Sequence, residues 1–226
     1  VRSTDNGSSW DNATSPTANY LWDVTFGNNT FVGVGLSGNI VRSTDNGSSW
    51  DNATSPTTKN LEEVTFGYNT FVGVGQSGNI VKSTDNGSSF DNATSPTANL
   101  LKGVTFGNNT FVGVGQSGNI VRSTDNGSSW DNATSPTANY LWDVTFGNNT
   151  FVGVGLSGNI VRSTDNGSSW DNATSPTANL LNGVTFGNNT FVAVASGGNI
   201  IRSTDNGSSW DNVTSPTSSA LNGVTF

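Results

Sequence analysis

An octapeptide returns every 40 residues along this chain, and its repetition constrains the fold more than any other feature. Residues 43–50 read Ser-Thr-Asp-Asn-Gly-Ser-Ser-Trp, and copies begin at Ser3, Ser43, Ser83, Ser123, Ser163 and Ser203. Only Phe90 departs from the pattern, standing where the other copies have Trp. A fixed period of this length is typical of arrays that stack one small supersecondary unit many times. We therefore take the 40-residue unit as the folding unit.

Each unit contains four short runs of β-forming residues and no helical periodicity. In the unit at 21–60, residues 21–26, 30–34, 39–44 and 48–54 are the expected strands, and Pro56 ends the pattern because proline cannot continue a ladder. Four strands per 40 residues are typical of a propeller blade. The first turn fits either a Gly-first or an Asn-Asn turn. Tyr68 favours the Gly-first form there, because bulky residues disfavour positive φ.

The octapeptide falls between the third and fourth expected strands, where it predicts a hairpin clip. Asp45 can accept backbone N–H groups of its own turn, and Gly47 can supply a positive φ. A three-residue loop at 45–47 would place Arg42 opposite Trp50. Since Lys82 accompanies Phe90, we expect a cation–aromatic contact between these positions. The structural carboxylates of the six copies are Asp5, Asp45, Asp85, Asp125, Asp165 and Asp205.

The pattern Ser-x-Asp-x-Gly-x-x-Trp resembles the Asp-box, or BNR repeat, of β-propellers such as sialidases, sortilin-type domains and plastid or cyanobacterial assembly factors. The resemblance covers the whole chain, in six copies. It implies a propeller in which the box joins the third and fourth strands and serves structure, not catalysis. Sialidases of the family need an arginine cluster, a Tyr–Glu pair and an Asp. The arginines here are all the repeated third-strand residue, so the resemblance does not extend to that activity.

The strand count predicts an all-β, six-bladed propeller forming one domain over residues 1–226. Blades begin near residues 21, 61, 101, 141 and 181, and residues 1–16 and 221–226 share the last blade, which removes an open sheet edge. Six full units would need 14 more residues, equivalent to the second strand of that blade. Either these residues lie outside the sequence, or a partner chain supplies the strand in a homo-oligomer. A five-bladed ring with strands left over is the remaining alternative.

The units differ mainly at two places, residues 18–23 and residue 36 with their equivalents. Because strands alternate in direction, both places lie on one face, near the mouth of the central channel. Trp22 and Trp142 correspond to Glu62, Lys102, Asn182 and Asn222, which a core would not accept, so we expect both Trp side chains to be exposed. The candidate ligand-binding residues of this face are Tyr20, Trp22, Asp23, Glu62, Glu63, Gln76, Lys102, Gln116, Tyr140, Trp142 and Asp143.

An aromatic side chain beside a carboxylate is a common way to hold a sugar ring. The sequence therefore predicts a non-enzymatic module that binds glycans, in which Trp22 and Trp142 stack and Asp23 and Asp143 accept hydrogen bonds. Alternatively, the two Trp side chains cover loops, and the chain is a structural or engineered repeat protein without a specific ligand. Residues 1–57 are identical to residues 121–177, which indicates recent amplification or design.

Composition excludes several other classes of function. The net charge is −8 with scattered basic residues, so nucleic-acid binding is not expected. No apolar run is long enough for a membrane span. Cys and His are absent, which removes thiol chemistry, Ser-His-Asp triads and the usual zinc ligands, and no metal or cofactor is expected. A natural glycan-binding module of this kind is expected outside the cell or on its surface.

Overall fold

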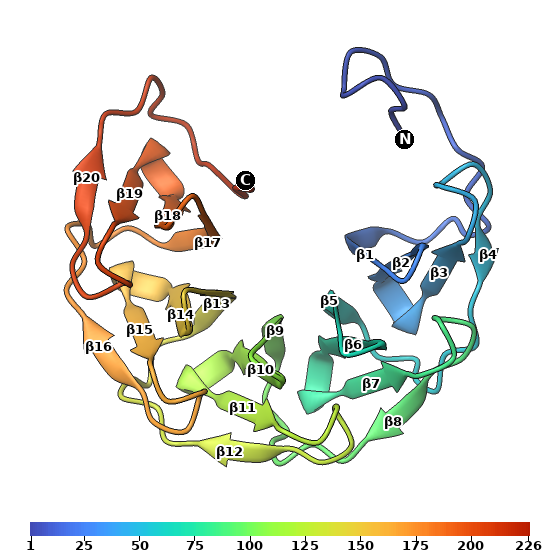
Figure 1. Cartoon of the computed structure of the whole chain (residues 1–226), viewed down its shortest axis with the longest axis horizontal. Coiled ribbons are helices and arrows are strands. Elements are labelled where there is room, and N and C mark those ends of the chain that lie inside the picture. The colour runs from blue at the N-terminus through green and yellow to red at the C-terminus, as the bar shows by residue number, and fades with distance from the viewer.

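A computed structural model describes residues 1–226 and contains five four-stranded antiparallel sheets, which surround a central space (Figure 1). Within each sheet, sequential strands are neighbours, and we call the sheets blades 1 to 5 in chain order. The first strand of each blade is innermost and the fourth is outermost (Figure 1). The all-β fold and the repeated four-stranded unit are therefore confirmed.

The strands have nearly the same bounds in every unit. The innermost strands are β1 (Leu21–Gly27), β5 (Leu61–Gly67), β9 (Leu101–Gly107), β13 (Leu141–Gly147) and β17 (Leu181–Gly187). The second strands are β2 (Thr30–Gly35), β6 (Thr70–Gly75), β10 (Thr110–Gly115), β14 (Thr150–Gly155) and β18 (Thr190–Ala195). The third strands are β3 (Ile40–Ser43), β7 (Ile80–Ser83), β11 (Ile120–Ser123), β15 (Ile160–Ser163) and β19 (Ile200–Ser203). The outermost strands are β4 (Asp51–Asn52), β8 (Asp91–Ala93), β12 (Asp131–Ala133), β16 (Asp171–Ala173) and β20 (Asp211–Val213).

One turn of 3₁₀-helix follows each second strand. These turns are η1 (Leu36–Gly38), η2 (Gln76–Gly78), η3 (Gln116–Gly118), η4 (Leu156–Gly158) and η5 (Ser196–Gly198). The chain contains no helix long and apolar enough to cross a membrane.

The hairpin between the first and second strands has a two-residue loop with positive φ at both positions. Asn28 and Asn29 have φ values of 49° and 57°, as a type I′ turn requires. Tyr68 has a φ of 50° in the same place, so the Gly-first turn expected there is wrong. Gly67 pairs with Thr70 in the same register as Gly27 with Thr30, and this register leaves two residues for the turn.

The register between the third and fourth strands also differs from expectation. Arg42 pairs with Asp51 rather than with Trp50, because the octapeptide forms a longer loop than three residues. The basic side chain crosses to the next blade instead of reaching an aromatic ring. Lys82 Nζ donates to Ser128 Oγ at 2.9 Å, and Arg162 Nε donates to the carbonyl of Asn206 at 3.2 Å. The predicted cation–aromatic contact is therefore wrong.

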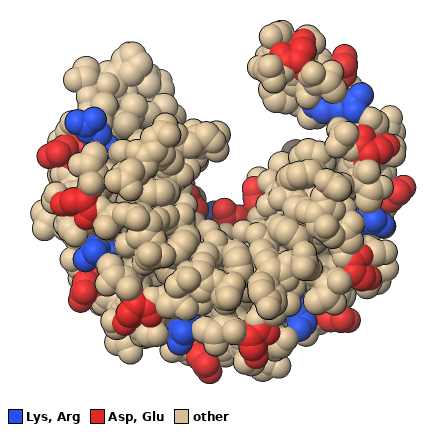
Figure 2. All heavy atoms as spheres, in the orientation of Figure 1, with Lys and Arg blue, Asp and Glu red and all other residues tan.

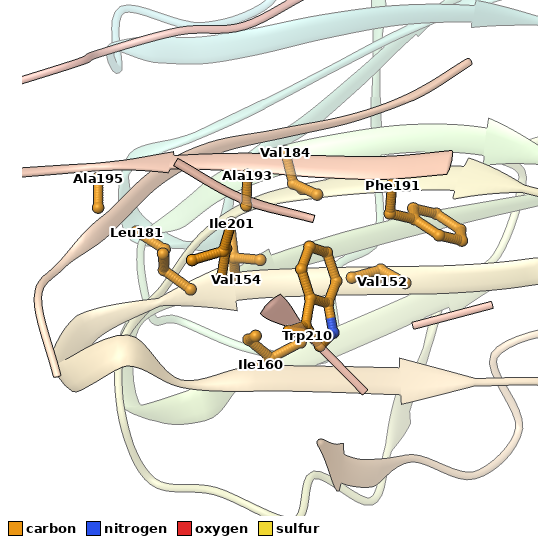
Figure 3. Close-up of a cluster of buried hydrophobic side chains, with 10 residues drawn as sticks. All are labelled: Val152, Val154, Ile160, Leu181, Val184, Phe191, Ala193, Ala195, Ile201 and Trp210. Atoms are coloured by element: carbon orange, nitrogen blue, oxygen red, sulfur yellow. The ribbon is translucent and has the colours of Figure 1, made fainter. Parts of the chain in front are cut away.

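The hydrophobic core lies between adjacent blades and repeats with the sequence. Between blades 4 and 5, Val152, Val154 and Ile160 pack with Leu181 and Ile201, and Trp210 lies among them (Figure 3). Equivalent residues form three further clusters of the same kind. Each blade is thus stabilised mainly by its neighbours, since burial of one such aliphatic side chain contributes about 1.5–3 kcal/mol.

The ring is open between its two ends (Figures 1 and 2). Residues 1–20 contain only the antiparallel bridge between Arg2 and Asp11, and residues 214–226 contain no strand. No hydrogen bond joins the two segments, so closure of a sixth blade is not confirmed. The physical reason is that a blade's first and third strands bond only through the second strand, and the 226 residues contain no second strand for this position. We call the opening between residues 1–20 and 214–226 the gap.

Candidate functional site

The octapeptide forms a hydrogen-bonded clip, as its sequence predicted. Asp45 Oδ1 accepts the N–H of Ser49 at 2.9 Å and the hydroxyl of Ser43 at 2.8 Å, and Oδ2 accepts the hydroxyl of Ser49 at 2.7 Å. Ser43 Oγ in turn accepts the N–H of Gly47 at 2.9 Å. These donors stabilise the carboxylate and lower the pKa of Asp45 to about 2. The clip satisfies its own polar groups and leaves Asp45 with a structural role.

The positions that vary between units meet at the innermost strands. Here a cavity of about 420 Å³, which we call the channel-mouth cavity, opens on the central space. Its lining includes seven of the candidate residues from the sequence: Trp22, Asp23, Glu62, Glu63, Lys102, Trp142 and Asp143. Asn182 and Asn222, which are equivalent to Trp22 in later units, also line it. Figure 2 shows acidic side chains facing this central space.

Four other candidates lie outside the cavity lining. Tyr20 is exposed, and Gln76 and Gln116 are exposed at the starts of η2 and η3. Tyr140 is half-buried, and its ring packs against Trp142 with the ring centroids 5.4 Å apart. The structure therefore gathers the inner-strand candidates but leaves the loop candidates apart from them.

Three half-buried carboxylates of the cavity accept hydrogen bonds from backbone N–H groups of the next blade. Asp23 Oδ2 accepts from Val64 N at 2.9 Å, and Glu63 Oε2 accepts from Val104 N at 2.6 Å. Asp143 accepts from Val184 N at 2.7 Å. An innermost strand has one edge without a partner strand, so these carboxylates satisfy edge donors that would otherwise depend on water. Asp23 and Asp143 thus have structural partners, whereas the sequence predicted ligand contacts for them.

Sequence reasoning missed this inter-blade link, although a signal was present. The position of Asp23, Glu63 and Asp143 holds Gly in the other units, at residues 103, 183 and 223. A position that alternates between a carboxylate and no side chain indicates a side chain with a specific partner rather than a solvated charge. Because blade 3 has Gly103 at this position, Val144 N of blade 4 donates to Asp143 of its own blade at 2.7 Å instead.

Burial raises the pKa of all three carboxyl groups. The pKa of Asp143 rises to about 6, mainly because burial disfavours its charged form. The pKa of Glu63 rises well above its ordinary value through burial and through the negative charges of Asp143 and Asp23. Burial also raises the pKa of Asp23. No group of three or more acidic side chains has the geometry to hold a metal ion.

The two Trp residues of the cavity differ in what covers them. Lys102 forms an ion pair with Glu62 at 2.6 Å, and its Nζ lies 5.6 Å from the centre of the Trp142 ring. With Tyr140 also against it, Trp142 is half-buried. Trp22 is 43% exposed. The local sequences around the two Trp residues are identical, so the difference comes from what precedes each of them. Blade 3, which carries Lys102, precedes Trp142, whereas the gap precedes Trp22.

Comparison with known proteins identifies an architecture and no family. No family model and no curated protein sequence matches the chain. A structure of YCF48 bound to a D1 peptide is similar with a TM-score of 0.72 and 17% identity, over 92% of this chain and 72% of that one. The computationally designed Ika8 protein has a TM-score of 0.73 and 13% identity, over 91% of this chain and 65% of that one.

An ancestral GH74 enzyme is similar with a TM-score of 0.71 and 17% identity, over 87% of this chain and 31% of the enzyme. At these identities the likeness extends to the fold alone. The chain is an all-β repeat protein of propeller-like architecture, built from repeated four-stranded blades.

Proposed function

We propose that this chain is a non-enzymatic binding module whose channel-mouth cavity holds a carbohydrate. One observation carries the proposal: the inner-strand positions that differ between otherwise repetitive units converge on this single cavity. The octapeptides and the first hairpin turns, which hardly vary, form clips and turns elsewhere. Variation that gathers at a concave surface is expected where a scaffold is kept constant and a binding surface is adapted.

The chemistry of the cavity favours a neutral polyhydroxylated ligand. The exposed indole of Trp22 can stack on the apolar face of a sugar ring. Asn182 and Asn222 add amide donors and acceptors, and the ion pair of Lys102 with Glu62 adds charged hydrogen-bonding groups without net charge. The buried carboxylates disfavour an anionic ligand. Trp142 contributes less stacking surface than Trp22, because Tyr140 and Lys102 already cover it.

Glycoside hydrolysis is the enzymatic alternative, since the raised pKa of Asp143 is a feature of general acids. Glycosidases need two carboxyl groups placed around the scissile bond. Here Asp23, Glu63 and Asp143 each accept a hydrogen bond from a strand N–H, and this structural role accounts for their partial burial. We therefore propose binding without turnover. Mass spectrometry of bound glycans after long incubation is expected to find them intact.

A glycan array with the wild-type chain and Trp22→Ala tests the binding proposal. We expect wild-type binding to a restricted set of glycans, a loss of tenfold or more in Trp22→Ala, and a smaller loss in Trp142→Ala. Trp10→Ala is the matched control, because Trp10 is also exposed but lies outside the channel-mouth cavity. An array on which nothing binds, or on which Trp22→Ala binds equally well, contradicts the proposal. That result favours a structural or engineered scaffold, to which the identical 57-residue stretches also point.

We also infer that the architecture is a six-bladed ring of Asp-box type, with the gap at the place of the sixth blade. Contacts at both margins of the gap support this inference and are described below. Glycans are abundant outside cells, so we place a natural form of this module there or at the cell surface. Antibody labelling of intact, unpermeabilised cells tests that placement.

A further inference from the structure

The face of blade 1 that borders the gap exposes apolar side chains that other blades bury. Val24 is 56% exposed, whereas its equivalent Val64 is 4% exposed. Leu21 and Phe26 are exposed on the same strand. A cavity of about 330 Å³ lies here between the N-terminal segment and blade 1, with mainly apolar lining that includes Leu21, Val24 and Val41. This face therefore lacks a covering layer that the interior blades have.

The interior blades show what the covering layer is. In each interior blade, two glycines are covered by two alternate valines from the second strand of the preceding blade. A Cβ atom on Gly73 would lie 3.9 Å from Val34, and one on Gly87 would lie 2.7 Å from Val32. Val72 and Val74 cover Gly127 and Gly113 in the same way, and Val112 and Val114 cover Gly167 and Gly153. The equivalent glycines of blade 1, Gly33 and Gly47, have no valine from a preceding unit near them.

The C-terminal margin of the gap holds the chain where the first strand of another blade would lie. Phe226 packs on Gly187 as Phe66 packs on Gly27 and Phe186 on Gly147. In every blade this Phe is paired with a Phe of the second strand at a centroid distance of 4.6 Å. Phe226 has no ring partner and is 61% exposed. The missing neighbour is again a second strand.

The N-terminal margin holds the equivalents of third and fourth strands. Arg2 pairs with Asp11 as Arg42 pairs with Asp51. The Arg2 guanidinium donates to the carbonyl of Asn46 at 3.4 Å and also to the hydroxyl of Ser48, both in the octapeptide of blade 1. Asn52 donates to the carbonyl of Pro16 at 3.4 Å, a contact repeated between later units. Both margins thus keep several of the contacts that neighbouring blades make elsewhere in the chain, and what they lack includes a second strand.

We propose that the gap is an acceptor site for one extended peptide segment with the pattern of the second strand, Gly-Asn-Asn-Thr-Phe-Val-Gly-Val-Gly. Antiparallel pairing as in β2 would align its Phe with Phe226 on one side and Ser3 on the other. Its first Gly would then cover Phe26, and its two Val residues would cover Gly47 and Gly33. Strand addition of this kind supplies main-chain hydrogen bonds, while the alternate side chains determine which peptide fits.

The occupant is an extended segment that is not already paired in a sheet, rather than the second strand of another folded copy of this chain. Every second strand of the chain is already paired on both edges, as β2 is between β1 and β3. A second copy would have to break a blade to donate one. The site is also distinct in chemistry from the channel-mouth cavity, although Trp22 and Asp23 line both cavities. Tests of the strand site therefore use no Trp22 variant.

A synthetic peptide with the sequence of residues 27–40 tests the proposal by isothermal titration calorimetry with the 226-residue protein. We expect saturable 1:1 binding, a rise in the thermal midpoint, and hydrogen-exchange protection of residues 1–4 and 221–226. The control peptide carries Val32→Asp and Val34→Asp, and we expect its affinity to fall by at least a hundredfold. Absence of binding by the parent peptide to folded protein, or equal binding by both peptides, overturns the proposal.

Two variants of the protein separate this site from general apolar binding. Val24→Asp places a charge on the exposed gap face and is expected to abolish peptide binding without unfolding the chain. Leu156→Asp is the control, because Leu156 is similarly exposed but lies on η4. Equal loss in both variants contradicts the site. Native mass spectrometry tests whether a second copy of the chain occupies the gap. A homodimer that excludes the peptide and that dissociates in Val24→Asp would assign the gap to a second copy and overturn the proposal.

Discussion

At the scale of single residues, Tyr68 occupies a conformation that its side chain disfavours. It has a φ of 50° in a turn where the other units have Asn. A left-handed conformation costs an ordinary residue about 1–2 kcal/mol, and Asn less. We predict that Tyr68→Asn raises the free energy of unfolding by about 1 kcal/mol in urea denaturation. The reverse change Asn108→Tyr serves as the control and is expected to lower it by a similar amount. An unchanged or lower stability of Tyr68→Asn would contradict this account of the turn.

Glu63 is the residue for which the buried carboxylates make the clearest pH prediction. Folding raises the pKa of Glu63. Its contribution to the free energy of unfolding is therefore full below the ordinary pKa of Glu, and it is lost as the pH rises through the pKa of the folded state. At pH 8 the unfolded chain ionises Glu63 readily while the folded chain resists its ionisation, so this carboxyl group lowers stability. Gln keeps an oxygen for Val104 N and removes the charge, so Glu63→Gln is expected to be more stable than wild type at pH 8 and no more stable at pH 4.

The adjacent residue provides the control for that measurement. Glu62 forms the ion pair with Lys102, so Glu62→Gln loses a favourable partner and should not gain stability at either pH. Thermal unfolding of the three proteins at both pH values compares them. A gain of equal size for Glu63→Gln at pH 4 and pH 8 would show that charge is not the cause. Asp143, whose pKa is about 6, adds to the loss of wild-type stability between roughly pH 4 and pH 6.

At the scale of the structural element, the octapeptide clip depends on one buried hydroxyl. Ser163 Oγ donates to Asp165 at 2.8 Å and accepts the N–H of Gly167 at 2.9 Å, and the residue is buried. Ser163→Ala leaves that N–H without a partner, which costs about 1–3 kcal/mol. We expect this loss in urea unfolding, against less than about 0.5 kcal/mol for Ser168→Ala, whose side chain is exposed. Equal effects would mean that the hydroxyl is not part of the clip.

The inner strands of each blade could be predicted from the sequence, but the register of the outer pair could not, and the fourth strand expected at 48–54 is only Asp51–Asn52. The expected strands 21–26 and 30–34 agree with β1 and β2, because alternating apolar residues and a two-residue turn determine them locally. The outer register depends on the hydrogen bonds of Ser43 and Asp45 across the loop. These contacts lengthen the loop, so Arg42 meets Asp51 and its side chain reaches the next blade. Spacing in the sequence carries no information about that crossing.

The candidate site was predictable in position but not in its contacts. Comparison of units located the inner-strand residues that line the channel-mouth cavity. The roles of Asp23 and Asp143 could not be read from one unit, because their partners, Val64 N and Val184 N, belong to the next blade. Trp22 and Trp142 have identical local sequences and different cover. Burial here is a property of the neighbouring blade rather than of the residue.

At the scale of the whole molecule, stability is expected to decline toward the gap. Interior blades have a neighbour on both sides, whereas blade 1 borders an exposed apolar face. Trp10 is 63% exposed and its equivalent Trp130 is 5% exposed, within identical stretches of sequence. Stacked units contact only their neighbours, so local opening is easiest at the ends. We predict that native-state hydrogen exchange is slowest in β9–β12 and faster in β1–β4. Uniform protection across all blades would contradict this gradient.

The valine-over-glycine contact between blades has a consequence for the number of units that a closed ring can contain. Each blade presents valines on one side and glycines on the other, so the interface is directional, and successive units are related by the same rotation. A directional interface yields a closed ring only when that rotation divides a full turn, and otherwise an open spiral. The angle between neighbouring sheets, and not the length of the gene, would then set the number of blades. An array with surplus units would have to leave the extra repeats outside the ring.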